Sequence, residues 1–451
     1  MSLLQKIIHN LFVRESGLKR YFLNTSWLLM ARVVQMLVSL VVGGMVARYL
    51  GPENYGTYNY VISFVGLFAA LSTLGISSVV VKDMLSGTAT PAVAMGSGFF
   101  LKIVGSIVAF LLVALCTFFI EDAAAVRWLL LIASVQTITK SAEIINAYYQ
   151  AKVASKRTVQ AQMVSLVGVN ILRVIFIFSE QPLAWFIYLL PLDAIIIGSI
   201  LTRFLRNSEA AISGWKLDTT YARQLLKESW PSLFSGLFVT VYMKIDQVML
   251  QDMLDASAVG WYAAAVRLSE VWISIPWILA GSLFPAIVNA YKESKDLFAT
   301  RINQAYILLL SIALIVAIPV ALFAPFIIQL IFGTDYNFSV NVLQVHIFSC
   351  VFIFLGSISN RWLVLEKKQQ YWMYYSGLGA LSNILLNLLL IPRYGIMGAA
   401  YATLISYAFA YYFAFALFRS TRKIFLSQTK NFLSVLMIIP AIREIRKLRI
   451  R

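Results

Sequence analysis

Charged residues are scarce in this chain of 451 residues, of which Asp, Glu, Lys and Arg make up 13%. Water-soluble domains typically carry about 25%. Hydrophobic residues reach 60% and the mean hydropathy is +0.79. This composition excludes a water-soluble globule. It predicts an all-α polytopic membrane protein, with room for about a dozen transmembrane helices, short loops and no sizeable soluble domain.

Cysteine and histidine are also rare. The two cysteines, Cys116 and Cys350, both fall in apolar segments, so neither a disulfide framework nor a metal site is indicated. Two histidines, His9 and His346, are too few for a metal cluster. The chain also lacks a nucleotide-binding loop and any loop long enough for a catalytic domain. We therefore expect no enzymatic activity, no metal and no cofactor.

Residues 24–71 form the most informative stretch, because two apolar segments flank a short turn in the manner of a transmembrane hairpin. Gly51 and Pro52 break the first helix, and tyrosines typical of a membrane interface follow. The same order of apolar helix, short turn and returning helix recurs in the second half, where Gly260 corresponds to Gly56 at an offset of 204 residues. The chain is therefore predicted to be an internal duplication.

The apolar segments predict about twelve spans, six in each repeat. After the first hairpin they lie near 97–119, 126–149, 159–178, 185–204, 229–253, 260–290, 302–323, 340–364, 371–391 and 395–418. This divides the chain into a cytoplasmic amphipathic segment (1–23), two six-helix lobes (24–205 and 228–419), a cytoplasmic linker (206–227) and a basic cytoplasmic tail (420–451). The short segment 432–442, which contains Pro440, is expected to lie at the membrane interface.

The net charge of +17 is unevenly distributed among the predicted loops. With both termini in the cytoplasm, nearly all loop lysines and arginines fall on the cytoplasmic side, and only Arg48, Arg127 and Arg393 fall on the other. This asymmetry follows the positive-inside rule. The high charge is thus a topology signal and gives no reason to expect nucleic-acid binding.

Eleven charged residues nevertheless lie within the predicted spans. A charge at the bilayer centre costs at least about 2.5–3.5 kcal/mol, so such groups normally face a partner or a watery cavity. They are Arg32, Lys102, Lys140, Arg173, Lys244, Arg267, Arg361, Glu143, Asp193, Asp246 and Glu270. Lys102 and Arg361 are near predicted cytoplasmic helix ends and are expected to snorkel to the interface. For Arg32, snorkelling and an inward position remain open.

Spacing separates the remaining charges. Lys140 with Glu143, and Arg267 with Glu270, are three residues apart and either neutralise each other or line a cavity together. Lys244 and Asp246, two residues apart, cannot both pair with each other and face one cavity. Arg173 has no acid nearby in the sequence, and an arginine binds phosphate oxygens in a bidentate manner. Arg173 is therefore the best single candidate for holding an anion.

Basic residues outnumber acidic ones among these charges, which predicts an anionic substrate bound at the repeat interface. The predicted substrate-binding residues are Arg32, Lys140, Arg173, Lys244 and Arg267. The acids Asp246, Glu270 and Glu143 are candidates for coupling to an ion, or are structural. The aromatic side chains Tyr242, Trp272 and Trp277 either stack on sugar faces or serve as packing and interfacial anchors.

Several blocks of this sequence resemble the bacterial polysaccharide transporter family, the Wzx-type lipid-linked oligosaccharide flippases. The opening Asn24-Thr-Ser-Trp27 with ARYLGPENYGTYNYV looks like the start of that family. ESWPSLFSGLFVTVYMKIDQVMLQDML with VGWYAAAVRLSEVW is similar to its seventh and eighth helices, and LLIPRYGIMGAAYATLISY to its eleventh-to-twelfth connection. The blocks are spread over most of residues 24–418.

The resemblance implies two six-helix lobes in a V, as in the multidrug/oligosaccharidyl-lipid/polysaccharide exporter superfamily. It also implies translocation of an undecaprenyl-pyrophosphate-linked repeat unit, of O-antigen or a similar surface polysaccharide, across the bacterial inner membrane by alternating access. A cationic lumen would bind the pyrophosphate. Membrane lipids, a polymerase and a chain-length regulator of the same pathway are the implied partners.

Two other functions remain open at this stage. A small-molecule multidrug exporter of the same superfamily would prefer an acidic cavity for cationic drugs, and the basic excess counts against it. A membrane glycosyltransferase or polymerase would usually need a long external loop with catalytic polar residues, which this sequence lacks. The peptidoglycan-precursor flippases of the superfamily normally carry two helices more than the twelve predicted here, which counts against that function.

Overall fold

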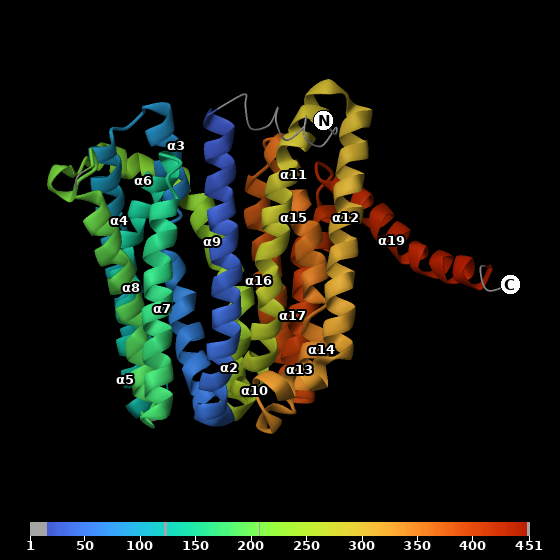
Figure 1. Cartoon of the computed structure of the whole chain (residues 1–451), viewed down its shortest axis with the longest axis horizontal. Helices are drawn as coiled ribbons and strands as arrows, with labels where there is room; N and C mark the ends of the chain where they lie inside the picture. Colours follow the sequence, from blue (N-terminus) through green and yellow to red (C-terminus); the bar gives the residue numbers. More distant parts are fainter. Residues whose placement is uncertain (1–15, 121–123, 207, 449–451) are drawn as a thin grey trace, which may run out of the picture. The chain divides into compact units, whose positions relative to one another are not determined.

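The computed structural model describes residues 16–120, 124–206 and 208–448, and within these the side chains of residues 34–435 and 437. No β-strand occurs within these ranges, and nearly every segment is helical (Figure 1). The predicted all-α fold is thus confirmed. The predicted amphipathic segment 1–23 lies mostly outside the described residues.

The first half of the chain consists of long helices joined by short turns. Its helices are α2 (Ser16–Thr73), α3 (Ser77–Ser86), α4 (Pro91–Cys116), α5 (Ala124–Thr139), the 3₁₀ segment η1 (Lys140–Ile144), α6 (Ile145–Ala151), α7 (Lys156–Phe178) and α8 (Leu183–Leu205). Helix α4 begins with Pro91 in its first turn, and the side chain of Thr90 accepts a hydrogen bond from the amide of Val93. Both features are typical of a helix N-terminus.

The second half repeats this pattern after the short 3₁₀ turn η2 (Ile212–Gly214). Its helices are α9 (Thr219–Met253), α10 (Ala256–Glu270), η3 (Val271–Ile273), α11 (Ser274–Glu293), α12 (Lys295–Leu322), α13 (Ala324–Ile331), η4 (Thr334–Tyr336), α14 (Ser339–His346), α15 (Ser349–Leu365), α16 (Gln370–Tyr394), α17 (Ile396–Ala408), the π-helical η5 (Phe409–Phe413), α18 (Ala414–Leu417) and α19 (Arg422–Leu448).

Within the described residues, eleven helical segments are long and apolar enough to cross a membrane, compared with about twelve predicted. The difference arises at the first hairpin, which runs as one helical segment through its turn. The break predicted at Gly51 is nevertheless present, because this residue has φ 69° and ψ 171°, well outside helical values. A glycine adopts this positive φ without the steric cost that a β-carbon would impose.

Two helices differ from the expected pattern. Helix α3 occupies Ser77–Ser86, where no helix was predicted, and it contributes Val79 and Val80 to a buried cluster. Residues 432–442, predicted to lie at the membrane interface, belong to the longer helix α19, and their interfacial position stays a prediction. The first half of α19 packs against α12, where Asn431 donates a hydrogen bond of 2.8 Å to the side-chain oxygen of Asn303.

The contacts divide the chain into two compact units. Unit 1 comprises residues 1–49 and 64–236, and unit 2 comprises residues 50–63 and 237–451. The predicted lobe boundaries at 24–205 and 228–419 stay a prediction. In unit 1, the helices α4, α5, α7 and α8 lie side by side (Figure 1). In unit 2, the core of enclosed helices includes α15, which packs against α11, α12 and α17.

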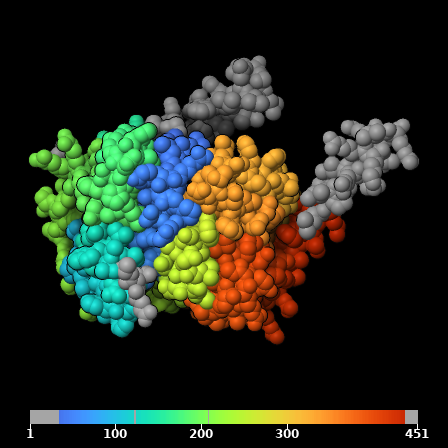
Figure 2. Space-filling view, turned by 90° about the horizontal axis from the view of Figure 1, so that it is seen from below, coloured from blue at the N-terminus to red at the C-terminus, as the bar shows by residue number. Residues whose placement is uncertain are grey.

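Unit 2 contains a close contact between the turns of the two predicted hairpins. A β-carbon added to Gly56 would lie 1.7 Å from the carbonyl oxygen of Ala256, and one added to Gly260 would lie 2.0 Å from that of Pro52. The neighbouring Tyr55 is fully buried and packs on the aromatic rings of Phe332, which follows α13, and of Tyr336 in η4. Figure 2 shows this end of the molecule, where the blue surface of α2 borders the yellow-green surface of α10. Only glycine allows the two backbones to approach so closely.

We expect Gly56→Val to destabilise the protein by roughly 1–3 kcal/mol, because the added side chain must force two packed backbones apart. Thermal unfolding of the purified protein in detergent measures the effect. Gly66→Ala on the same helix is the matched control, since a β-carbon there would meet nothing within 4 Å. Equal melting temperatures for the Gly56 variant and the wild type would contradict the packing described.

Candidate functional site

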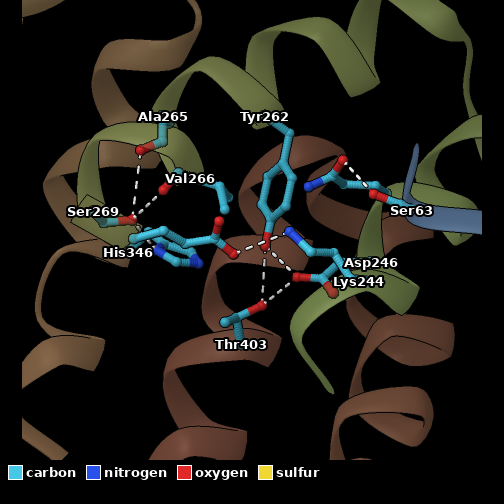
Figure 3. Close-up of polar contacts among 11 residues, drawn as sticks. Ser63, Lys244, Asp246, Tyr262, Ala265, Val266, Ser269, His346 and Thr403 are labelled. Atoms are coloured by element: carbon cyan, nitrogen blue, oxygen red, sulfur yellow. Dashed lines mark hydrogen bonds and ion pairs between the residues drawn. The ribbon is translucent and has the colours of Figure 1, made fainter. Parts of the chain in front are cut away.

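A polar cluster lies inside unit 2, among otherwise apolar helices. Helix α9 contributes Lys244 and Asp246, and α10 contributes Tyr262, Ser269 and Glu270, while α14 and α17 add one residue each (Figure 3). The two helices that carry the charges are the arms of the second predicted hairpin. A short turn therefore brings them together, with Asp255 as the N-cap of α10.

Asp246 is the most enclosed charge-bearing residue of the cluster, with 2% of its surface exposed. One of its carboxylate oxygens accepts hydrogen bonds from the hydroxyl of Tyr262 and, at 2.6 Å, from the hydroxyl of Thr403 on α17. The other oxygen, Oδ1, is buried without a hydrogen-bond partner. A buried carboxylate that is only half satisfied has an unused capacity to accept a proton or bind a cation.

Lys244 and Glu270 form an ion pair beside this carboxylate. Their Nζ and Oε1 atoms are 3.2 Å apart, and about a quarter of each side chain is exposed, 26% and 27% respectively. The pair explains how two neighbouring charges on α9 are both accommodated: Lys244 is bound by α10, and Asp246 by hydroxyl groups. This arrangement agrees with the expectation that Lys244 and Asp246 need partners from elsewhere.

Two further buried polar pairs surround the charged groups. The hydroxyl of Ser269 lies 2.6 Å from Nδ1 of His346, which is 4% exposed. Ser63 donates a hydrogen bond of 2.7 Å to the side-chain oxygen of Gln247, the residue that follows Asp246. The cluster therefore joins the segment 50–63 to α9, α10, α14 and α17 by side-chain hydrogen bonds that are protected from water.

The remaining predicted site residues lie elsewhere. Arg173, on α7 of unit 1, donates a hydrogen bond of 3.2 Å to the side-chain oxygen of Asn170, one turn earlier. Lys140 and Glu143 both lie in η1 and are partly buried. Arg267 is partly buried on α10. The side chain of Arg32 lies outside the described residues.

The structure thus brings together only part of the predicted site. Lys244, Asp246 and Glu270 meet within one cluster of unit 2, whereas Lys140, Glu143 and Arg173 belong to unit 1. Among the described residues no ion pair within 4.0 Å joins Lys140 to Glu143, so this pair does not neutralise itself. The convergence of charges from both halves on one central cavity stays a prediction.

The snorkelling predicted for Lys102 is wrong. This residue is 5% exposed and lies about three turns into α4, packed between helices of unit 1. Helix α4 begins at Pro91, several residues before the predicted start at 97, and the side of the helix that Lys102 occupies faces the interior. Neighbouring Ser106, one turn on, lies 3.0 Å from the hydroxyl of Ser141 and donates to the carbonyl of Thr137.

Tyr262, Thr403 and His346 are among the cluster residues that the sequence did not predict to act at a site. Tyr262 and Thr403 lie in apolar helices, where a hydroxyl side chain gives no signal. Of these three residues, only His346 could have been noticed in the sequence, because it is one of only two histidines in the chain. Within the described residues, no group of three or more His, Cys, Asp or Glu side chains is placed to hold a metal ion.

We expect Glu270→Gln to lower the free energy of unfolding by about 1–2 kcal/mol, because it leaves the Lys244 ammonium partly buried without its carboxylate. The double variant Lys244→Met/Glu270→Gln should recover most of this loss, since it removes the orphaned charge as well. Thermal unfolding of the wild type, Glu270→Gln, Lys244→Met and the double variant in detergent tests the expectation. Additive effects of the two substitutions would contradict the pairing.

Comparison with known proteins finds two family models that match this chain. The family model described as polysaccharide biosynthesis protein matches residues 22–291, and the MatE model matches residues 231–389. The chain is 23% identical to a putative O-antigen transporter of Shigella flexneri, over 84% of this chain and 92% of the relative. It is 20% identical to a probable low-salt glycan biosynthesis flippase of Haloferax volcanii, over 80% and 76% of the two chains.

Two solved structures share the fold at low sequence identity. The lipid II flippase MurJ, in its inward closed conformation, superposes with a TM-score of 0.71 at 16% identity and 93% coverage of both chains. A multidrug resistance transporter of the MATE family, in its inward-facing conformation, gives a TM-score of 0.68 at 15% identity, over 92% of this chain and 99% of the other. These matches confirm a polytopic membrane transporter fold.

Proposed function

Since the chain belongs to the polysaccharide biosynthesis protein family, we propose that it is a flippase for an undecaprenyl-pyrophosphate-linked oligosaccharide repeat unit. The observation that carries this proposal is the similarity to the putative O-antigen transporter of Shigella flexneri. The match extends over 92% of the length of that relative. The repeat unit, of O-antigen or a similar surface polysaccharide, moves from the cytoplasmic to the periplasmic leaflet of the inner membrane. A polymerase and a chain-length regulator would then use it.

The physical problem in this reaction is the diphosphate. Two adjacent anionic phosphates cannot enter hydrocarbon without compensation, so the pathway must supply cations in a water-accessible position. We propose that Arg32, Lys140, Arg173, Lys244 and Arg267 serve this purpose in the two lobes. The lipid tail stays in the bilayer while the head group passes between the lobes by alternating access. Both termini are cytoplasmic in this scheme.

Asp246 is the residue we propose for ion coupling, with Glu270 and Glu143 as further candidates. The support is the geometry of its carboxylate, which is buried, held on one oxygen by two hydroxyl groups and free of hydrogen bonds on the other. A cation or proton arriving there would complete its bonding. Because Asp246 and Lys244 lie on the same helix, occupancy of one site would change the field at the other.

One alternative has a specific observation in its favour. The MatE model matches residues 231–389, and a multidrug transporter shares the fold, which is what a small-molecule exporter would also show. Such an exporter of cationic drugs would prefer an acidic cavity. The intramembrane charges of this chain are predominantly basic, and this favours the anionic, lipid-linked substrate.

Deletion of the gene in its own host tests the function. We expect loss of surface polysaccharide and accumulation of the lipid-linked repeat unit on the cytoplasmic leaflet, both restored by the intact gene. Restoration with Arg173→Ala should be at least tenfold poorer, because a phosphate-binding guanidinium is lost. Arg206→Ala, which removes an exposed arginine after α8, is the matched control. Unchanged glycan together with altered drug tolerance would instead support the exporter.

The coupling role of Asp246 predicts a separable defect. In proteoliposomes, Asp246→Asn should abolish the response of head-group translocation to an imposed proton or sodium gradient, because the amide cannot bind either cation as a carboxylate does. Binding of undecaprenyl pyrophosphate should persist. Asp193→Asn is the control, since that acid is bound to Ser165 in unit 1. A gradient response equal to that of the wild type would exclude Asp246 from coupling.

A further inference from the structure

Arg361 occupies an unusual position in unit 2. It lies on α15, which belongs to the most enclosed of the candidate spans: 78% of the apolar window of Ser339–Leu365 is buried, against 17–56% for the others. The residues on either side along the chain include the buried Ser359 and Trp362. Arg361 itself is only partly buried and lies about one turn from the end of α15. Its side chain extends from this enclosed helix toward α11.

The surroundings of the guanidinium on α11 are aromatic and open. Its central carbon lies 5.4 Å from the centroid of the Phe284 ring, in the geometry of a cation–π contact. A β-carbon added at Gly281 would lie 3.7 Å from one of its nitrogens, so the absence of a side chain at position 281 leaves room beside the charge. Gly281 and Phe284 share one face of α11, because they are three residues apart.

The charge of Arg361 has no acidic counterpart in the part of the chain that the structure describes. Among the described residues, no carboxylate lies within 4.0 Å of it, and its Nε atom is buried without a hydrogen-bond partner. A buried donor without an acceptor is unfavourable, and a cation–π contact supplies no acceptor. Lys244, which is also proposed to meet the anion, is paired with Glu270. An anion that binds at Lys244 competes with this carboxylate, whereas an anion that binds at Arg361 does not.

Two indole rings, one of which lies one turn away along α11, pack against the buried cluster around Tyr242. Trp277 lies one turn before Gly281 on α11, and its ring centroid is 5.8 Å from that of Trp372 on α16, with the two planes nearly perpendicular. Both rings are partly exposed. Along this face of α11 lie, in order, the indole of Trp277, the open space at Gly281 and the phenyl ring of Phe284. The guanidinium of Arg361 lies over the last of these rings. Flat apolar rings next to a cation suit a ligand that joins a sugar to a phosphate.

We propose that Arg361, supported by Phe284 and given room by Gly281, binds a phosphate of the lipid-linked head group, while Trp277 and Trp372 pack on its first sugar. This subsite rests on the proposed flippase function and assigns a position on unit 2 to the head group. The guanidinium forms bidentate hydrogen bonds to the phosphate oxygens, which include the missing acceptor for Nε. The sugar is recognised by the ring faces one turn further along α11.

Equilibrium binding of undecaprenyl pyrophosphate to the purified full-length protein in nanodiscs tests the phosphate position. We expect Arg361→Gln to weaken binding at least tenfold. The affinity of Arg361→Lys should lie between those of the wild type and Arg361→Gln, because lysine keeps the charge but loses the bidentate geometry. Arg301→Gln, at an exposed arginine of α12, should bind as the wild type does. Wild-type affinity in Arg361→Gln would overturn the proposal.

A second variant keeps the arginine and fills the gap. Gly281→Leu should weaken binding of the same probe as strongly as Arg361→Gln, whereas Gly168→Leu, where a β-carbon meets nothing within 4 Å, should have no effect. Melting temperatures of all variants establish that they are folded. Unchanged affinity in a folded Gly281→Leu protein would show that the space beside the guanidinium is not used by the ligand.

The sugar position is tested with undecaprenyl-pyrophosphoryl-N-acetylglucosamine as a second probe. Trp277→Leu should lower the affinity for this probe while leaving that for undecaprenyl pyrophosphate within twofold. Equal losses for both probes would overturn the sugar assignment. If the wild type binds neither probe and gene deletion leaves surface glycan intact, the flippase function itself fails. If the wild type binds and Arg361→Gln binds equally well, only the subsite fails.

Discussion

Hydrocarbon offers no hydrogen bonds, so every polar group that this protein carries into the membrane must find its partner within the protein. The cluster of unit 2 obeys this constraint by distributing its contacts: Lys244 takes a carboxylate, Asp246 takes two hydroxyl groups and His346 takes a serine. Among the buried side-chain atoms of the described residues that lack a hydrogen-bond partner are Oδ1 of Asp246 and Nε of Arg361. In the two proposals made above, a bound cation or phosphate completes the bonding of these two atoms.

Much of the fold follows from the sequence because the apolar segments are long and sharply bounded. Helices α7 and α8 begin and end within a few residues of the predicted limits, and the break at Gly51 lies where predicted. The failures are local. Helix α3 is short and carries two charges, so hydropathy alone does not distinguish it from a loop. At α19 the helix runs on through Pro440 and is longer than the segment 432–442 that the sequence marked, while the interfacial position of that segment stays a prediction.

The site was less predictable than the fold, for reasons of distance and direction. Charges stand out in apolar sequence, so Lys244, Asp246 and Glu270 were found, but the hydroxyl partners of Asp246 come from elements that the sequence does not connect. Tyr262 and Thr403, for example, are 141 residues apart. The position of a residue along a predicted helix also indicates only how deep it lies in the membrane, and not what its side chain packs against. Lys102 and Arg361 were both predicted to snorkel, and Lys102 is instead buried among helices. Arg361 lies over an aromatic ring about one turn from the end of α15, and its snorkelling stays a prediction.

The glycine contact between the hairpin turns follows the predicted internal repeat. Under the 204-residue offset, Pro52 corresponds to Ala256 as Gly56 corresponds to Gly260, so the two close approaches are the same contact made twice, once in each direction. Reciprocity of this kind is the property of an isologous interface about a two-fold axis.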